Sequence, residues 1–156
     1  MDVQLSAEIT TGNMKTEGKK TIIVQVTINA PVERVWKNWI SPDDIVKWNY
    51  ASAEWHTPEA KNDLRIGGRF LYRMEAKDGS SGFDFAGVYS EVKPDELIEY
   101  TLGDNRKVKV VFAARENKTD VIETFEAEDI NPVEQQRAGW LSILNNFKRH
   151  VESDRQ

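Results

Sequence analysis

The sequence predicts an α+β fold in which a curved antiparallel sheet packs around a long C-terminal helix, with two short helices after the first strand. Three observations predict it. Apolar and polar residues alternate between turn signals through the middle of the chain, an apolar stripe at helical spacing ends it, and a short tryptophan-rich segment precedes both. We expect residues 1–19 to form a flexible polar segment, with Met14 as an alternative start, and residues 20–153 to form a single domain.

The first predicted elements are a strand and two short helices. Thr21–Ile28 is rich in β-branched residues, which favour strands. Pro31 suits the first position of a helix, and Ser41 is expected to cap a second helix that begins with Pro42. Together these helices carry Trp36, Trp39 and Trp48. Indole rings on helices this short must pack against a larger partner, which the rest of the chain supplies.

The central strands are predicted from period-two alternation. We expect Ala51–Arg65 to be irregular, with a short strand near Trp55 and His56 and a polar loop over Pro58–Asp63. Two longer strands flank the turn signal Asp78–Gly82. Their inward residues are Phe70, Tyr72 and Met74 before the turn, and Phe83, Phe85 and Tyr89 after it. Gly87 inside the second strand predicts a bend or a close approach, and therefore a curved sheet.

Three further strands are expected over Leu97–Leu102, Arg106–Phe112 and Thr119–Ala127, and short turns between them indicate an antiparallel meander. Tyr100 and Phe112 belong to the inward set. In the last strand both faces hold apolar residues, so its inward side stays open. The inward face is either Val121 with Phe125 or Ile122 with Thr124.

A long amphipathic helix is predicted at the C-terminus. Asn131 is its expected cap, Pro132 its first residue, and Glu134 completes a capping box. One stripe of the helix contains Val133, Gln136, Arg137, Trp140, Ile143, Leu144, Phe147 and Val151. Arg137 within this stripe is expected to extend to solvent, the alternative being that it meets a ligand carboxylate at a cavity mouth.

Composition narrows the possible functions. The net charge of −5 arises between residues 51 and 105. This segment has eleven acidic and six basic side chains, distributed along amphipathic strands. We therefore expect no nucleic-acid partner. The longest apolar runs fall short of the ~20 residues that a membrane span needs, and a signal peptide is not expected, so the cytoplasm is the predicted location.

Few motifs for catalysis or metal binding are present. The chain has no cysteine and two histidines far apart in sequence, so neither a metal nor a cofactor is expected. His56 is expected at the surface; a catalytic role would need Glu54 or Asp63 to orient it. No phosphate-binding loop, dinucleotide fingerprint or GxSxG motif occurs.

A set of motifs in fixed order resembles a known family. The motifs are Ala30–Trp36, Ser41-Pro42 with Trp48, Gly67–Phe70, Phe85–Tyr89 with Val92 and Pro94, and Gly139-Trp140 with Leu144, Asn146 and Phe147. Over about Thr21–Glu152 the chain resembles the family named for the activator of the heat-shock-protein ATPase, within the START and birch-pollen-allergen superfamily. That resemblance implies a helix-grip fold, often with a hydrophobic cavity between sheet and helix.

The residues and the resemblance lead to one main functional hypothesis and two alternatives. The inward aromatic residues form either an ordinary core or the wall of a cavity that binds a small aromatic or lipid-like molecule. The predicted ligand-binding residues are Trp48, Phe70, Tyr72, Met74, Phe83, Phe85, Tyr89, Tyr100, Phe112, Trp140, Leu144 and Phe147. Tyr72 and Tyr100 are the expected polar contacts. The alternatives are a chaperone-associated module, linked to the stress response, and a cyclase or dehydratase using Tyr72, Tyr100 or His56.

Overall fold

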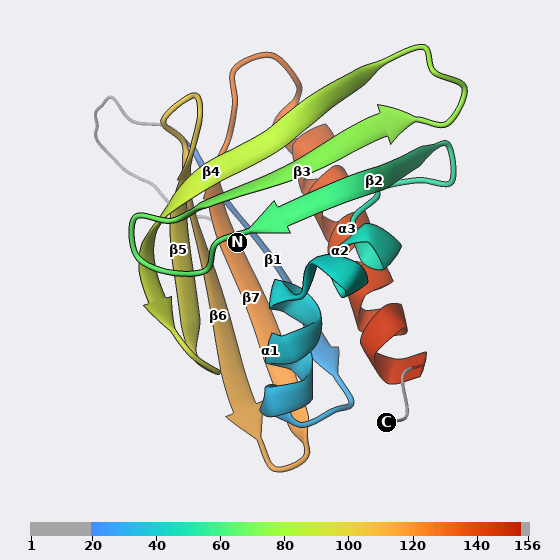
Figure 1. The fold of residues 1–156 in the computed structure, drawn as a ribbon. Coiled ribbons are helices and arrows are strands. Elements are labelled where there is room, and N and C mark those ends of the chain that lie inside the picture. Colours follow the sequence, from blue (N-terminus) through green and yellow to red (C-terminus); the bar gives the residue numbers. More distant parts are fainter. Residues whose placement is uncertain (1–19, 154–156) are drawn as a thin grey trace.

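Seven antiparallel strands form one curled sheet around the C-terminal helix in the computed structural model, which describes residues 20–153 (Figure 1). The strands are β1 (Thr21–Ile28), β2 (Trp55–Asn62), β3 (Arg69–Ala76), β4 (Gly82–Lys93), β5 (Leu97–Leu102), β6 (Lys107–Arg115) and β7 (Lys118–Glu126). The helices are α1 (Val32–Ile40), α2 (Pro42–Trp48) and α3 (Val133–Ser153). The predicted helix-grip architecture is confirmed. The flexible segment predicted over residues 1–19 and the alternative start at Met14 lie outside the described residues.

The strand order is β1-β7-β6-β5-β4-β3-β2. Strands that follow one another in sequence from β2 to β7 are therefore neighbours in the sheet, which is the predicted meander. β1 pairs with β7 at the other edge, so the chain crosses from one side of the sheet to the other through α1 and α2 (Figure 1). This crossing places both short helices beside α3 at one end of the sheet.

The register of the last hairpin decides the inward face of β7, which the sequence left open. Arg115 pairs with Lys118, so Val110 on β6 lies opposite Glu123 on β7. Val110 is buried, and Glu123 faces inward with it. Val121 and Phe125 share this face. A carboxyl group therefore points into the interior between two apolar residues.

β2 corrects the expectation of an irregular segment. It is an eight-residue edge strand paired with β3, and its register shifts between His56 and Glu59. Pro58 lies within this shift. A proline has no N–H to donate to a neighbouring strand, and a bulge in an edge strand is one of the few places in a sheet that accept it. The polar side chains of β2 do not alternate with apolar ones, because an edge strand has only one neighbour and is partly exposed to water.

The starts of the short helices differ slightly from the prediction. Pro31 is extended and precedes α1, which begins one residue later, at Val32. Ser41 precedes α2, but its side chain makes no capping hydrogen bond. Its carbonyl oxygen accepts instead from the backbone N–H groups of Asp44 and Ile45, at 3.0 and 2.9 Å. Pro42 is the first residue of α2, as predicted.

The predicted capping box at the start of α3 is replaced by a different carboxylate. The Glu128 side chain accepts hydrogen bonds from the backbone N–H of Asn131 at 2.7 Å and from its side-chain amide at 3.0 Å. Glu134, the predicted partner, pairs with Arg137 at 3.2 Å. Glu128 can make these contacts because the chain doubles back between β7 and α3. That turn could not be placed from local spacing.

An aromatic cluster fills the end of the molecule below α1 and α2. Trp39 lies at the centre, with ring centroids 5.1 Å from Trp48, 5.7 Å from Phe112 and 4.9 Å from Phe147. Trp36 packs edge-on to Phe112 at 5.2 Å. The indole N–H of Trp48 donates to the backbone carbonyl of Asn38 at 3.0 Å, which satisfies its polar atom within the core. The two short helices thus bury their tryptophans against β6 and α3.

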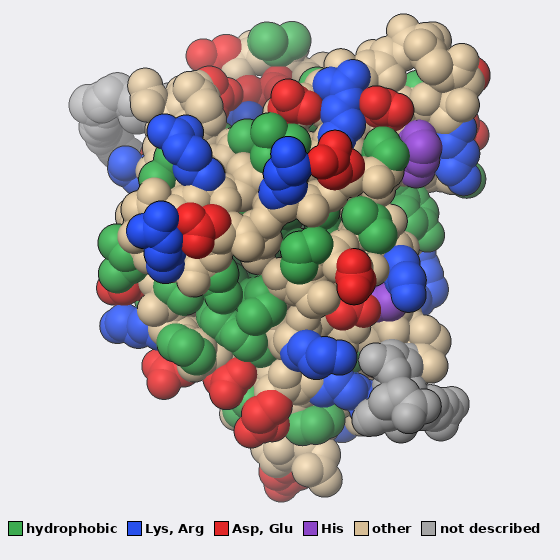
Figure 2. All heavy atoms as spheres, in the orientation of Figure 1, with side chains coloured by type: hydrophobic (Ala, Val, Ile, Leu, Met, Phe, Trp, Pro, Cys, Tyr) green, Lys and Arg blue, Asp and Glu red, His purple; other side chains and the backbone are tan. Residues whose placement is uncertain are grey.

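Charged side chains of both signs are interspersed over the face of the molecule drawn in Figure 2. No helix within residues 20–153 combines the length and the apolar character that crossing a bilayer requires.

Gly87 provides a test of the sheet packing. A Cβ atom at this position would lie 2.8 Å from Cε2 of Phe70 and 2.9 Å from the carbonyl oxygen of Thr101. Because the backbone oxygen cannot move aside easily, Gly87→Ala should lower the free energy of unfolding by about 1–3 kcal/mol, measured by urea denaturation.

Gly139→Ala on α3 is the matched control. Its added methyl group meets nothing within 4 Å, so it should stabilise the helix by about 0.5–1 kcal/mol. Equal effects of the two changes would contradict this packing.

Candidate ligand cavity

A partly open cavity of about 230 Å³ lies between α3 and the inner face of the sheet. Ten of the twelve residues predicted to bind a ligand line it, and they come from α2, β3, β4, β5 and α3. Trp39, Ile98 and Ile143 add further apolar surface. The curvature of the sheet and the offset of α3 leave this space unfilled. The pattern of inward aromatic residues therefore surrounds a void as well as a core.

Phe112 and Phe147 are the two predicted residues that do not line the cavity. Both are fully enclosed in the aromatic cluster, with exposed fractions of 3% and 0%. Trp39 and Trp48 belong to the same cluster, and they also line the open space, so they separate Phe147 from the cavity. The cluster therefore forms the floor of the cavity, and its deeper members support that floor from below.

The sheet side of the cavity is built around the ring of Phe70. Its centroid lies 5.0 Å from Tyr72, 5.4 Å from Tyr89 and 4.8 Å from Tyr100. Phe70 can take this central position because it is paired with Gly87, which has no side chain to block the ring. The wall is consequently a set of ring faces and edges with three phenol groups at its margin.

The helix side of the cavity is held by stacking. Trp140 on α3 stacks on Phe125 of β7, with ring centroids 3.9 Å apart and planes inclined by 11°. The same indole packs edge-on to the ring of Phe85, with centroids 6.0 Å apart. Gln136, one turn earlier on α3, also lines the space, and its amide donates to the carbonyl oxygens of Glu128 and Asn131. The contacts of Trp140 and of Gln136 thereby fix the position of α3 against the sheet and against the loop before it.

Glu123 is the functional group that the sequence analysis missed. It lines the cavity, its residue is 6% exposed, and within residues 20–153 its carboxyl group makes no hydrogen bond or ion pair. Burial away from water raises the pKa of this carboxyl to about 8, because the charged form loses its hydration. At neutral pH the group is therefore mostly protonated and can donate a hydrogen bond into the cavity.

Three phenol groups accompany Glu123. Burial, followed by the charge of Glu123, raises the pKa of Tyr100 well above its usual value. Burial, followed by Tyr89, does the same for Tyr72. The Tyr89 hydroxyl donates to the Asn62 side chain at 2.5 Å, which fixes its direction. These phenols stay neutral at physiological pH, and their hydroxyl groups can donate or accept hydrogen bonds.

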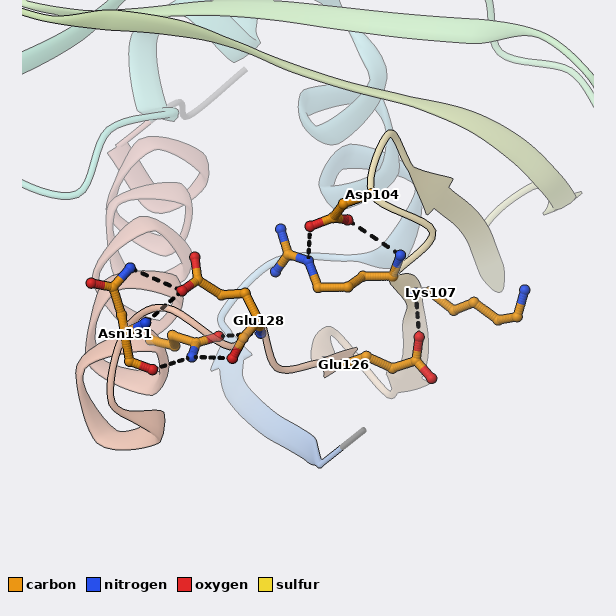
Figure 3. A network of polar contacts seen from close by, with 7 residues as sticks. Asp104, Lys107, Glu126, Glu128 and Asn131 are labelled. Atoms are coloured by element: carbon orange, nitrogen blue, oxygen red, sulfur yellow. Dashed lines mark hydrogen bonds and ion pairs between the residues drawn. The ribbon is translucent and has the colours of Figure 1, made fainter. Parts of the chain in front are cut away.

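Polar contacts lie at one end of the cavity, where Arg106 in the turn between β5 and β6 and Glu128 in the loop that leads into α3 both line it (Figure 3). The Arg106 guanidinium lines the cavity and donates to the Asp104 carboxylate at 2.7 Å. Glu128 also lines the cavity and holds Asn131, and Lys107 donates its backbone N–H to Glu126 at 2.7 Å (Figure 3). This polar end contrasts with the aromatic floor.

Neither histidine lines the cavity. His56 lies on the edge strand β2, 3.9 Å from Glu75, with a half-exposed side chain. His150 joins α3 to α2 through Asp44 at 2.9 Å. Arg137 also lies outside the cavity and donates to the backbone carbonyl of Ile23 on β1 at 3.2 Å. No group of three or more potential metal ligands occurs among residues 20–153.

Comparisons with known proteins agree with this architecture. A family model described as activator of Hsp90 ATPase homolog 1-like protein matches residues 29–152. No curated protein matches the chain.

Several solved structures share the fold. An AHSA1-like protein from Aeromonas hydrophila is 45% identical, with a TM-score of 0.81, and the match covers 86% of this chain and 93% of that one. A protein from Cytophaga hutchinsonii is 51% identical over the same shares, with a TM-score of 0.75. A protein from Chromobacterium violaceum is 26% identical, with a TM-score of 0.76, over 86% of this chain and 99% of that one.

Proposed function

This chain belongs to the family of activator of Hsp90 ATPase homolog 1-like proteins, and we propose that it binds a small, largely apolar molecule in the cavity between the sheet and α3. The observation that carries the proposal is an aromatic cavity of about 230 Å³ with few polar groups in its wall. Enclosed apolar space with a small number of directed polar groups is the usual form of a small-molecule site.

The wall indicates which kind of molecule fits. Ring faces from Phe70, Phe85 and Trp140 suit flat aromatic or lipid-like groups, since burial of apolar area contributes about 25 cal/mol per Å². Tyr72 and Tyr100 would fix its orientation through their hydroxyl groups. The deep aromatic cluster is already packed, so the ligand occupies the cavity without opening the core.

Filling the cavity should abolish binding. Ile143→Trp places a large ring in the space that Ile143 lines on α3. We expect a saturable rise in melting temperature with one class among fatty acids, sterols, flavonoids and polyketide-like aromatics, and we expect it to disappear in this variant. Ile23→Trp is the matched control, because Ile23 is 53% exposed on β1 and does not line the cavity. Its response should equal that of the unmodified chain. An unchanged response in Ile143→Trp would contradict the proposed site.

Binding of a protein partner is the alternative function if none of these compounds raises the melting temperature. The exposed large apolar residues among residues 20–153 are Ile23, Ile66, Phe83 and Ile130. They lie on four separate segments. An association with a chaperone is what the family name suggests for such a partner, and a pull-down at micromolar concentration would test it.

A further inference from the structure

We propose that the cavity selects a lipophilic amine, whose protonated nitrogen pairs with the Glu123 carboxylate inside the ring of phenols and aromatic side chains. This inference rests on the proposed function and names the chemical class of its ligand. It starts from a buried acidic side chain that faces the cavity and has no partner within residues 20–153.

The position of Glu123 on the sheet supports this assignment. β7 brings its carboxyl group into the cavity between Val121 and Phe125, so no neighbouring side chain on its own strand can neutralise it. The rings of Tyr72 and Tyr100 line the same space. Aromatic faces carry partial negative charge and attract cations, most strongly where water is excluded. A cation in this cavity is thus favoured by the acid and by the rings.

The cost of keeping a carboxyl group here also favours a charged ligand. A neutral hydrogen bond to a ligand could be made by glutamine or threonine, without the penalty of burying an ionisable group. Only a ligand that carries positive charge uses the charge that Glu123 can supply. In forming the pair, Glu123 releases its proton to solvent and the ammonium nitrogen donates to the resulting carboxylate.

The other ionisable groups around the cavity do not compete for this role. They are Tyr72 on β3, Tyr89 on β4, Tyr100 on β5, Arg106 in the turn before β6, and Glu128 before α3. The Arg106 charge is matched by Asp104 at 2.7 Å, so it offers little attraction to an anionic ligand. Glu128 adds negative charge at the polar end. The three phenols are neutral.

Three probes that share one ring system separate the possibilities. We would titrate the protein with 1-naphthylmethylamine, 1-naphthylmethanol and 1-naphthoate by calorimetry at about pH 6.5 and about pH 7.5, in buffers of different ionisation enthalpy. The amine should bind about tenfold or more tightly than the alcohol, and about tenfold more tightly at the higher pH, with release of about one proton.

Glu123→Gln should remove the preference for the amine, the pH dependence and the proton release while the alcohol still binds. Glu99→Gln, the same change on the outer face of β5, should alter none of them.

Each other outcome overturns the inference in a different way. Equal binding of the three probes would retain the cavity as a binding site and reject the preference for amines. Tightest binding of the naphthoate would make Arg106 the recognition group instead. Failure of all three probes to bind would reject both this inference and the proposed function.

Discussion

Replacing Glu123 with glutamine should raise the free energy of unfolding by about 5 kcal/mol above pH 8 and leave it nearly unchanged below about pH 4.5. Burial raises the pKa of this carboxyl from 4.5 to about 8, and each pKa unit corresponds to about 1.4 kcal/mol. Glutamine has the shape of the protonated acid but never ionises. The variant therefore reports what the ionisation of Glu123 costs the folded state.

The sign follows from proton binding. Between about pH 4.5 and about pH 8 the folded chain holds the proton on Glu123 while the unfolded chain has lost it. Raising the pH through this window therefore favours unfolding, and the contribution of Glu123 to stability is largest below the window. Urea denaturation at three pH values, followed by tryptophan fluorescence, measures the difference. Glu99→Gln is the control, because its partly exposed side chain lies on the outer face of the sheet. A Glu123→Gln gain that is the same at all pH values would contradict the buried carboxyl.

Phe147→Ala should lower the free energy of unfolding by about 3–5 kcal/mol, because it leaves a void in the fully buried aromatic cluster. The ring of Phe147 lies 4.9 Å from that of Trp39 and 4.8 Å from that of Trp48. Neither indole can fill the void without losing its own packing. The change should also alter the tryptophan emission of the folded protein, since both indoles border the void.

Phe83→Ala is the matched control for this core substitution. Phe83 is 47% exposed and packs only loosely, 5.9 Å from the ring of Trp55. Its removal should cost about 1 kcal/mol or less by the same denaturation measurement. Losses of similar size in the two variants would show that the cluster beneath α1 and α2 is not the centre of the core.

Much of the architecture could be predicted because its signals are local. The alternation of Phe70, Tyr72 and Met74 and the apolar stripe of α3 each report which side of an element is buried, and the structure agrees. β2 was missed for a physical reason. An edge strand with one neighbour tolerates Pro58 and many polar side chains, so it lacks the alternation that identifies strands with two neighbours.

Glu123 could have been found from turn geometry. Its strand is apolar on both faces, and alternation alone therefore cannot orient it. The loop between β6 and β7 has two residues, Glu116 and Asn117, and this length sets Glu123 opposite Val110. The strand predicted over Arg106–Phe112 has the correct inward residues but continues to Arg115, so both the end of β6 and the turn length were missing.

The cavity itself depends on distant contacts that the sequence does not display. Phe147 and Leu144 belong to the same stripe of α3, yet Leu144 lines the open space and Phe147 lies in the packed floor. The difference arises because α1 and α2 cover only one end of the sheet. The part of the sheet that α1 and α2 cover therefore decides which inward residues are packed in the core and which line the cavity.

The position of a bound probe shows whether the space between the sheet and α3 is the binding site. We would measure nuclear Overhauser contacts between 1-naphthylmethylamine and the methyl groups of the isotope-labelled protein. We expect contacts to Ile98, Ile143 and Leu144, which line the space between the sheet and α3. Contacts confined to the exposed Ile23, Ile66 or Ile130, or no contacts at saturating probe, would contradict it.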